Sequence, residues 1–176
     1  MGKISMRILT VSLVFAAALL FASDTPEAGS SAPSFQLQSQ EGTPVSLDQF
    51  KGKWVVLYFY PMDFTSGCTL EAHNFQRDLT KYEAANAAIL GVSVDSVDSH
   101  KRFCAKEGLN FKLLADPDGQ VAKQYGSLGN MGITKYAQRH TFLINPAGKV
   151  VKVYTEVKPS SHSDEVLADL AKLEKS

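Results

Sequence analysis

The sequence predicts an α/β fold in which a central mixed sheet is flanked by helices, and three observations support it. Residues 54–60 (WVVLYFY) form a continuous apolar run and residues 88–94 (AILGVSV) a similar one, typical of strands buried on both faces. Between these runs, apolar side chains recur at helical spacing: Ala72, Phe75, Leu79 and Tyr82. The length of 176 residues suits one domain with a sizeable core.

The other elements follow in order along the chain. A β-hairpin is predicted over residues 35–46, where FQLQ and PVSL flank the turn-like SQEGT. After the second apolar run, a helix closed by Gly108 has on one face Val97, Lys101 and Cys104. A strand at residues 111–116 ends at the turn DPDG, and a short helix follows at residues 121–126.

The last part of the chain predicts a second hairpin and a final helix. Residues 140–156 form two strands around the turn at residues 145–148. Residues 161–175 form a helix that has on one face Val166, Leu170 and Leu173. Strands that alternate with helices and end in an antiparallel hairpin indicate a sheet with helices on both faces. This element order is that of a thioredoxin-like fold.

The N-terminus has the pattern of a targeting segment. Lys3 and Arg7 precede a run of 15 mostly apolar residues, 8–22, which is shorter than the ~20 residues of a membrane span. Ala22 offers a small residue for cleavage, although Leu20 departs from the preferred A-x-A pattern. We therefore expect a signal peptide over residues 1–22 and an exported, periplasmic or otherwise extracytoplasmic protein; the alternative is an uncleaved membrane anchor.

Composition sets the domain boundaries and excludes one class of partner. Residues 23–33 are small, polar and contain Pro and Gly, so they predict a flexible linker before a domain at residues 34–176. Lys and Arg together number 18, as do Asp and Glu, and no basic patch stands out. Nucleic acid is therefore not an expected partner.

Cys68 is one of only two cysteines, and it follows the first apolar run at a strand-to-helix junction. The first turn of a helix has unpaired N–H groups and a partial positive charge, both of which favour a thiolate. Gly67 leaves the sulfur accessible, Pro61 fixes the exit of the loop, and the hydroxyl of Thr65 can reach the same point. The alternatives are a cysteine that packs as a small apolar residue and a threonine that only caps the helix.

The motif Pro61-x-x-x-Thr65-x-x-Cys68, within YFYPMDFTSGCTLEAHNF, resembles the active-site signature of peroxiredoxins. The resemblance is to the bacterioferritin-comigratory, or peroxiredoxin Q, branch of the AhpC/TSA superfamily, and it extends from about Ala32 to the C-terminus through GVSVD and RHTFLINPAGKV. It implies a thioredoxin-like fold and a thiol peroxidase that needs no cofactor.

The resemblance also implies roles for single residues. Cys68 resembles the peroxidatic cysteine, whose thiolate attacks a hydroperoxide and becomes a sulfenic acid. Thr65 resembles the hydroxyl that orients the peroxide, and Pro61 shields the sulfur from water. Arg139 resembles the guanidinium that stabilises the thiolate and the leaving oxygen. Without the resemblance, Arg139 would be interpreted as a surface cation at a strand end.

The sequence departs from the branch at one position. Many members have a second cysteine five residues after the first, where this chain has His73. Cys104, in the next helix, is expected instead to resolve the sulfenic acid by forming an intramolecular disulfide. Helix ends must then unwind, because a disulfide needs Cα atoms about 4.4–6.8 Å apart. The alternatives are a lone active-site thiol with an inert Cys104, and a permanent structural disulfide.

A metal site is not favoured. His100 and Cys104 have the i, i+4 spacing of ligands on one helix, but Cys68 and His73 diverge around theirs, so a Cys2His2 zinc site fits poorly. The other histidines are expected as polar or strand residues: His73, His140 and His162. Three further charged residues are expected to be solvated or in local pairs: Asp63, Glu71 and Arg77.

The expected enzyme is a monomer that reduces hydroperoxides, is recycled by a thioredoxin-like reductant, and touches a membrane only if its N-terminal segment stays uncleaved. Two other function classes remain open. A thioredoxin-fold thiol–disulfide oxidoreductase usually has C-x-x-C, which this sequence lacks. The second is a non-catalytic binding module stapled by a disulfide. Peroxide consumption that depends on Cys68 separates the first function from both.

Overall fold

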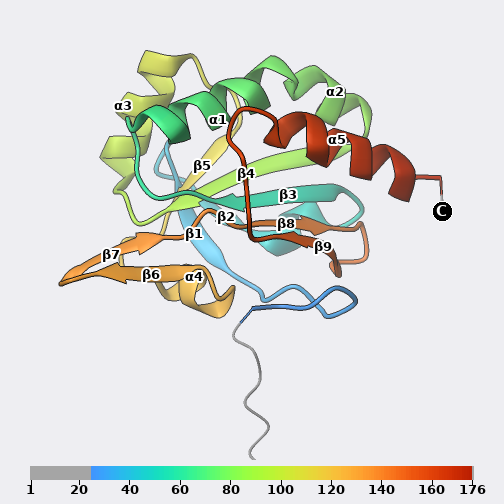
Figure 1. Cartoon of the computed structure of the whole chain (residues 1–176), viewed down its shortest axis with the longest axis horizontal. Helices are drawn as coiled ribbons and strands as arrows, with labels where there is room; N and C mark the ends of the chain where they lie inside the picture. Colours follow the sequence, from blue (N-terminus) through green and yellow to red (C-terminus); the bar gives the residue numbers. More distant parts are fainter. Residues whose placement is uncertain (1–24, 176) are drawn as a thin grey trace, which may run out of the picture.

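A seven-stranded mixed sheet forms the centre of the computed structural model, which describes residues 25–175 (Figure 1). Its strands are β1 (Gln36–Ser39), β2 (Pro44–Ser46), β3 (Trp54–Phe59), β4 (Ala87–Ser93), β5 (Lys112–Ala115), β8 (Thr141–Ile144) and β9 (Val150–Tyr154). They lie in the order β2-β1-β5-β4-β3-β8-β9. The central pairs β3–β4 and β4–β5 are parallel, and the outer pairs are antiparallel. The predicted mixed sheet with its N-terminal hairpin is confirmed.

Helices cover both faces of this sheet. They are the 3-10 helix η1 (Leu47–Phe50) and the α-helices α1 (Ser66–Arg77), α2 (Leu79–Ala84), α3 (Val97–Glu107), α4 (Gln120–Gln124) and α5 (His162–Leu173). Helices α1, α2, α3 and α5 pack on one face, and α4 lies on the other (Figure 1). Successive side chains of β3 point to opposite faces, so Tyr58 joins the core under α1 and Phe59 joins the core on the side of α4.

The helix predicted after the first strand is interrupted at Asp78, which separates α1 from α2. The Asp78 carboxylate is fully buried and accepts hydrogen bonds from Arg77, from Lys81 at 2.8 Å and from Ser163 of α5 at 2.9 Å. Because a buried carboxylate must keep such partners, Asp78 stabilises the break and ties it to α5. The apolar spacing alone did not reveal this break.

A second, two-stranded sheet was not predicted. It pairs β6 (Leu128–Met131) with β7 (Thr134–Ala137) and extends away from the main sheet (Figure 1). Neither segment has the apolar alternation of a half-buried strand, and Ile133 at the turn is fully exposed. The pairing therefore depends on backbone hydrogen bonds more than on burial.

The linker predicted over residues 23–33 differs from the structure where the chain is described. Gly29 donates its N–H to the carbonyl of Val150 at 2.7 Å, Val150 donates to Ser30 at 3.0 Å, and Ala32 donates to Gly148 at 2.9 Å. Residues 29–32 are therefore tied to the start of β9 rather than free. The signal peptide or anchor predicted over residues 1–22 lies outside the described residues. Within residues 25–175, no helix has the length and apolar character needed to cross a membrane.

Candidate active site

Cys68 lies in the first turn of α1, directly behind the loop that leaves the C-terminal end of β3. Thr65 occupies the N-cap position with extended backbone angles, φ −81° and ψ 147°. The side chain of Cys68 is turned inward, so the residue is only 2% exposed. A thiol at this place faces the unpaired N–H groups and the positive end of the helix dipole, as the sequence indicated.

Arg139 reaches Cys68 from the segment just before β8, the strand that pairs with β3. Strand β8 pairs with β3, with Thr141 opposite Tyr58, and Phe59 donates its N–H to the carbonyl of His140 at 2.8 Å. This pairing places Arg139 just before β8 and next to the start of α1. Its Nη2 donates to the Sγ of Cys68 at 3.2 Å, which puts a cation against the sulfur.

Glu71 is the second partner of this guanidinium, and the sequence did not reveal it. Its Oε2 accepts from the Nη1 of Arg139, and its side chain is 1% exposed. Burial raises the pKa of Glu71 to about 7, although the charge and hydrogen bond of Arg139 act in the opposite direction. Its Oε1 is buried and has no hydrogen-bond partner among residues 25–175. The expectation of a solvated or locally paired carboxylate is therefore wrong, because the partner is 68 residues away in sequence.

Thr65 and Pro61 lie in the loop between β3 and α1, with Thr65 at the N-cap of α1. The Thr65 hydroxyl is exposed and donates to the carbonyl of Met62 at 3.0 Å, and it makes no side-chain capping bond to α1. Its oxygen keeps its lone pairs for another donor. Pro61 is half-buried. The Thr65 side chain therefore does not cap α1.

Cys104 lies near the end of α3 and belongs to the same apolar core cluster as Cys68. Both thiols are free, and Cys104 is 8% exposed. Burial, together with the negative charges of Asp63 and Glu41, raises the pKa of Cys104 to about 12. In this arrangement Cys104 is a neutral thiol and a poor nucleophile.

Comparisons with known proteins identify the family. The model of the AhpC/TSA family matches residues 28–153. This chain belongs to the AhpC/TSA family. Peroxiredoxin Bcp of Escherichia coli K12 is 41% identical over 145 residues, covering 80% of this chain and 93% of that protein. Chloroplastic peroxiredoxin Q of Sedum lineare is 43% identical over 146 residues, covering 82% of this chain and 78% of that protein.

Solved structures of the same branch share the fold. A Cys-to-Ser mutant of Xylella fastidiosa PrxQ superposes with a TM-score of 0.80 at 34% identity, covering 85% of this chain and 98% of the other. A Xanthomonas campestris bacterioferritin comigratory protein gives a TM-score of 0.75 at 38% identity, covering 79% and 91%. The chain is a peroxiredoxin and a thiol peroxidase with the fold that the sequence predicted.

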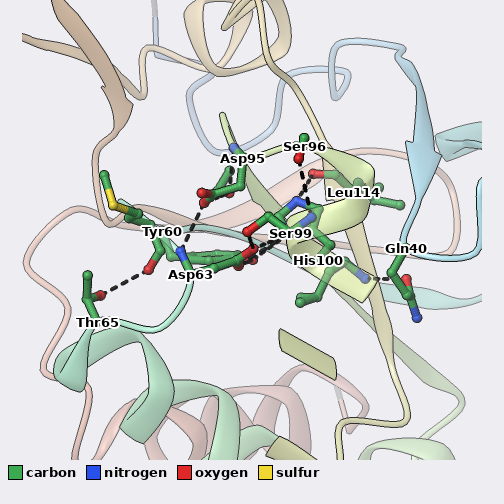
Figure 2. Close-up of polar contacts among 12 residues, drawn as sticks. Gln40, Tyr60, Asp63, Thr65, Asp95, Ser96, Ser99, His100 and Leu114 are labelled. Carbon is green, nitrogen blue, oxygen red and sulfur yellow. Dashed lines mark hydrogen bonds and ion pairs between the residues drawn. The ribbon is translucent and has the colours of Figure 1, made fainter. Parts of the chain in front are cut away.

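The loop of this peroxiredoxin is also fixed by a buried polar network (Figure 2). Asp63 accepts hydrogen bonds from Tyr60 at 2.7 Å, from Ser99 at 2.7 Å and from the Nδ1 of His100 at 2.9 Å. Burial raises the pKa of Asp63, but the hydrogen bonds and charge of His100 outweigh it, so this pKa stays below its usual value. The expectation that Asp63 is solvated or paired only locally is therefore wrong, because Asp63 is buried and two of its partners lie on α3.

His100 faces Asp63 instead of forming a ligand pair with Cys104. Among residues 25–175, no group of three or more His, Cys, Asp or Glu side chains could hold a metal ion. His73, at the position where relatives often carry a cysteine, contacts Glu107 of α3 at 2.9 Å and is about half exposed. The sequence did not reveal that the loop before α1 pairs with α3 through Asp63 and His100, because these residues are 37 positions apart and no local pattern marks the contact.

Proposed function

We propose that this peroxiredoxin reduces hydrogen peroxide and organic hydroperoxides with Cys68 as the attacking thiol and Cys104 as the resolving thiol. The observation that carries the proposal is the 3.2 Å contact between Arg139 Nη2 and Cys68 Sγ at the start of α1. A cation and a helix N-terminus directed at one sulfur favour the thiolate, which is the nucleophilic form. Cys104, the other cysteine among residues 25–175, is instead buried near the negative charges of Asp63 and Glu41.

In the first step, the Cys68 thiolate attacks the terminal oxygen of the hydroperoxide. The S–O bond forms as the O–O bond breaks, and two electrons pass from sulfur to the peroxide. The leaving oxygen departs as water or an alcohol after taking a proton, and Cys68 becomes a sulfenic acid. In this proposal, Arg139 stabilises the charge that develops on this oxygen, and the Thr65 hydroxyl orients the peroxide.

Organic hydroperoxides are included because exposed apolar side chains lie close to Cys68 in sequence. Met62, Phe64 and Leu70 are 46%, 43% and 45% exposed, and they flank Cys68 in sequence on the loop and on α1. Exposed large apolar residues so close together mark a contact surface for an apolar group. The related Xanthomonas campestris protein is described as having alkyl peroxide reduction activity.

In the second step, Cys104 attacks the sulfenic sulfur, expels water and forms the Cys68–Cys104 disulfide. The two thiols belong to one core cluster, and we expect a local opening of the chain to bring them together. In two separate mutants of Xanthomonas campestris peroxiredoxin Q, a different cysteine has been replaced by serine. These two cysteines are as many residues apart in that sequence as Cys68 and Cys104 are here. That opening must also let Cys104 ionise, since burial raises its pKa to about 12.

A thioredoxin-like dithiol then reduces the disulfide and returns both thiols. The proposed cycle uses the two cysteines of one chain and is compatible with a monomeric enzyme, which is what we propose. We also place it outside the cytoplasm, on the pattern of Lys3, Arg7 and the apolar residues 8–22. Sequencing the N-terminus of protein from the native host tests this: a start between residues 23 and 34 supports export, and an intact Met1 in a soluble cytoplasmic fraction refutes it.

Turnover with hydrogen peroxide and thioredoxin tests the two cysteine roles. Cys68→Ser should be inactive, because a serine hydroxyl is not ionised near neutral pH. Cys104→Ser should reduce one equivalent of peroxide and then stop with thioredoxin, while a small thiol restores part of the turnover by resolving from outside. Wild-type turnover by Cys104→Ser with thioredoxin would show that the enzyme works with one cysteine.

A further inference from the structure

The loop at residues 61–65 is anchored to helix α3 through one buried side chain, Asp63. Asp63 is 4% exposed and His100 of α3 is completely buried. The Nδ1 of His100 lies 2.9 Å from the Oδ2 of Asp63, and Ser99 of α3 donates to the same oxygen at 2.7 Å. The N–H of Asp63 donates to the Oδ2 of Asp95 at 2.9 Å, so the backbone of the loop is held as well.

The two ring nitrogens of His100 have different partners. Its Nε2 lies 3.2 Å from the carbonyl of Leu114, which can only accept a hydrogen bond. Its Nδ1 faces the Asp63 carboxylate, which already accepts from Tyr60 and Ser99 (Figure 2). Both ring nitrogens of His100 therefore face hydrogen-bonding partners, and the Asp63–His100 contact is a buried, hydrogen-bonded pair. Hydrogen bonds to an ionised carboxylate such as that of Asp63, whose pKa is lowered by its partners, are about twice as strong as neutral ones.

The Asp63–His100 pair joins the two parts of the chain that carry the cysteines. Asp63 precedes α1, whose first turn holds Cys68, and His100 is one helical turn before Cys104 in α3. Phe64 strengthens the same junction, because its ring packs edge-on against Phe103 of α3 with centroids 5.1 Å apart. Phe64 does so with a φ of 61°, an uncommon angle for a residue with a side chain.

We propose that Asp63 and His100 are positioning residues that hold the Cys68 loop against α3, and that separation of this pair controls the rate at which Cys68 reaches Cys104. The pair keeps the first turn of α1 folded, so that Cys68 stays beside Arg139 until peroxide has reacted. After oxidation, the turn must unwind, and the loop must be released from α3. The inference rests on the proposed role of Cys104.

The test compares the two chemical steps in variants of the full chain. Asp63→Asn keeps the shape but removes the negative charge: its carbonyl oxygen can accept from Tyr60, and its amide can donate to the Nδ1 of His100. Loss of the charge assistance should speed formation of the Cys68–Cys104 disulfide about tenfold, with the rate of Cys68 oxidation nearly unchanged. Rapid quenching after one equivalent of peroxide, thiol alkylation and mass spectrometry measure both rates.

Two further variants make the test specific. Ser99→Ala removes one donor to Asp63 from the edge of the network and should speed disulfide formation about threefold, even if Asp63→Asn does not fold. Asp98→Asn removes an exposed charge from the same first turn of α3 and should leave both rates at the wild-type values. A merely structural role would lower the thermal stability of Asp63→Asn and Ser99→Ala without changing the ratio of the two rates.

Hydrogen exchange tests the Asp63–His100 pair independently of whether Cys104 is the resolving thiol. If wild type forms no Cys68–Cys104 disulfide, the resolving role is wrong. Amide exchange of residues 63–69 in the reduced protein then decides whether the Asp63–His100 pair holds the loop. Faster exchange in Asp63→Asn than in Asp98→Asn supports it. Equal exchange, or equal disulfide rates in wild type, Asp63→Asn and Ser99→Ala, overturns it.

Discussion

Replacing Glu71 by Gln tests whether burial or Arg139 decides the charge of this carboxyl group. Burial raises the pKa of Glu71 to about 7, whereas the usual value in an unfolded chain is about 4.3. Between these two values the folded protein binds one proton that the unfolded chain does not. The free energy of unfolding therefore falls as pH rises through this window and is constant above it. At about 1.4 kcal/mol per pKa unit, the loss over the whole window is about 4 kcal/mol, of which about 3 kcal/mol falls between about pH 5 and about pH 8.

Urea unfolding of the reduced protein at about pH 5 and about pH 8 measures this loss. Gln does not titrate, so the stability of wild type relative to Glu71→Gln should fall by about 3 kcal/mol between these two pH values. Glu83→Gln, which removes an exposed carboxylate on α2, is the matched control and should not reproduce the loss. A difference that stays constant, or that grows with pH, would show that Arg139 keeps Glu71 ionised and would refute the reasoning.

The remaining predictions concern the first oxidation step and the packing beneath it. Arg139→Met should slow the reaction of Cys68 with peroxide about 100- to 1000-fold in stopped-flow experiments, and a rate within threefold of wild type would remove Arg139 from the site. Thr65→Val should slow the same step about tenfold or more, whereas Thr65→Ser should keep it; equal loss in both would mean that the hydroxyl is not used. Gly91→Ala should destabilise the fold by about 1–3 kcal/mol in urea unfolding, because an added Cβ would lie 2.8 Å from the ring of Tyr58; unchanged stability would contradict that packing.

The central sheet was predictable because its strands are buried on both faces. The runs at residues 54–60 and 88–94 became β3 and β4, and both contribute to the two cores. Burial leaves a pattern in the sequence, whereas the β6–β7 hairpin is held by backbone bonds and leaves none. The break at Asp78 escaped prediction for a related reason, since it depends on Ser163, which is far away in sequence.

Part of the active site was predictable from local residues. The strand-to-helix junction and the Pro61–Thr65–Cys68 spacing pointed to the thiol, and the family resemblance pointed to Arg139, which the β3–β8 pairing brings to it. The burial of Glu71 and Asp63 could not be foreseen. Their partners lie 68 and 37 residues away, so a carboxylate in this segment has the same local sequence whether it is solvated or buried.

The most direct test of the central claim is mass spectrometry of the reduced wild-type protein after one equivalent of hydrogen peroxide. Attack by Cys68 and resolution by Cys104 predict a monomer that is lighter by two hydrogens, with one peptide pair joining Cys68 to Cys104. Cys68→Ser should keep its reduced mass under the same conditions, and Cys104→Ser should carry one added oxygen on Cys68. Peroxide reduction by Cys68→Ser, or oxidation of the wild type that leaves Cys68 unmodified, would contradict the account.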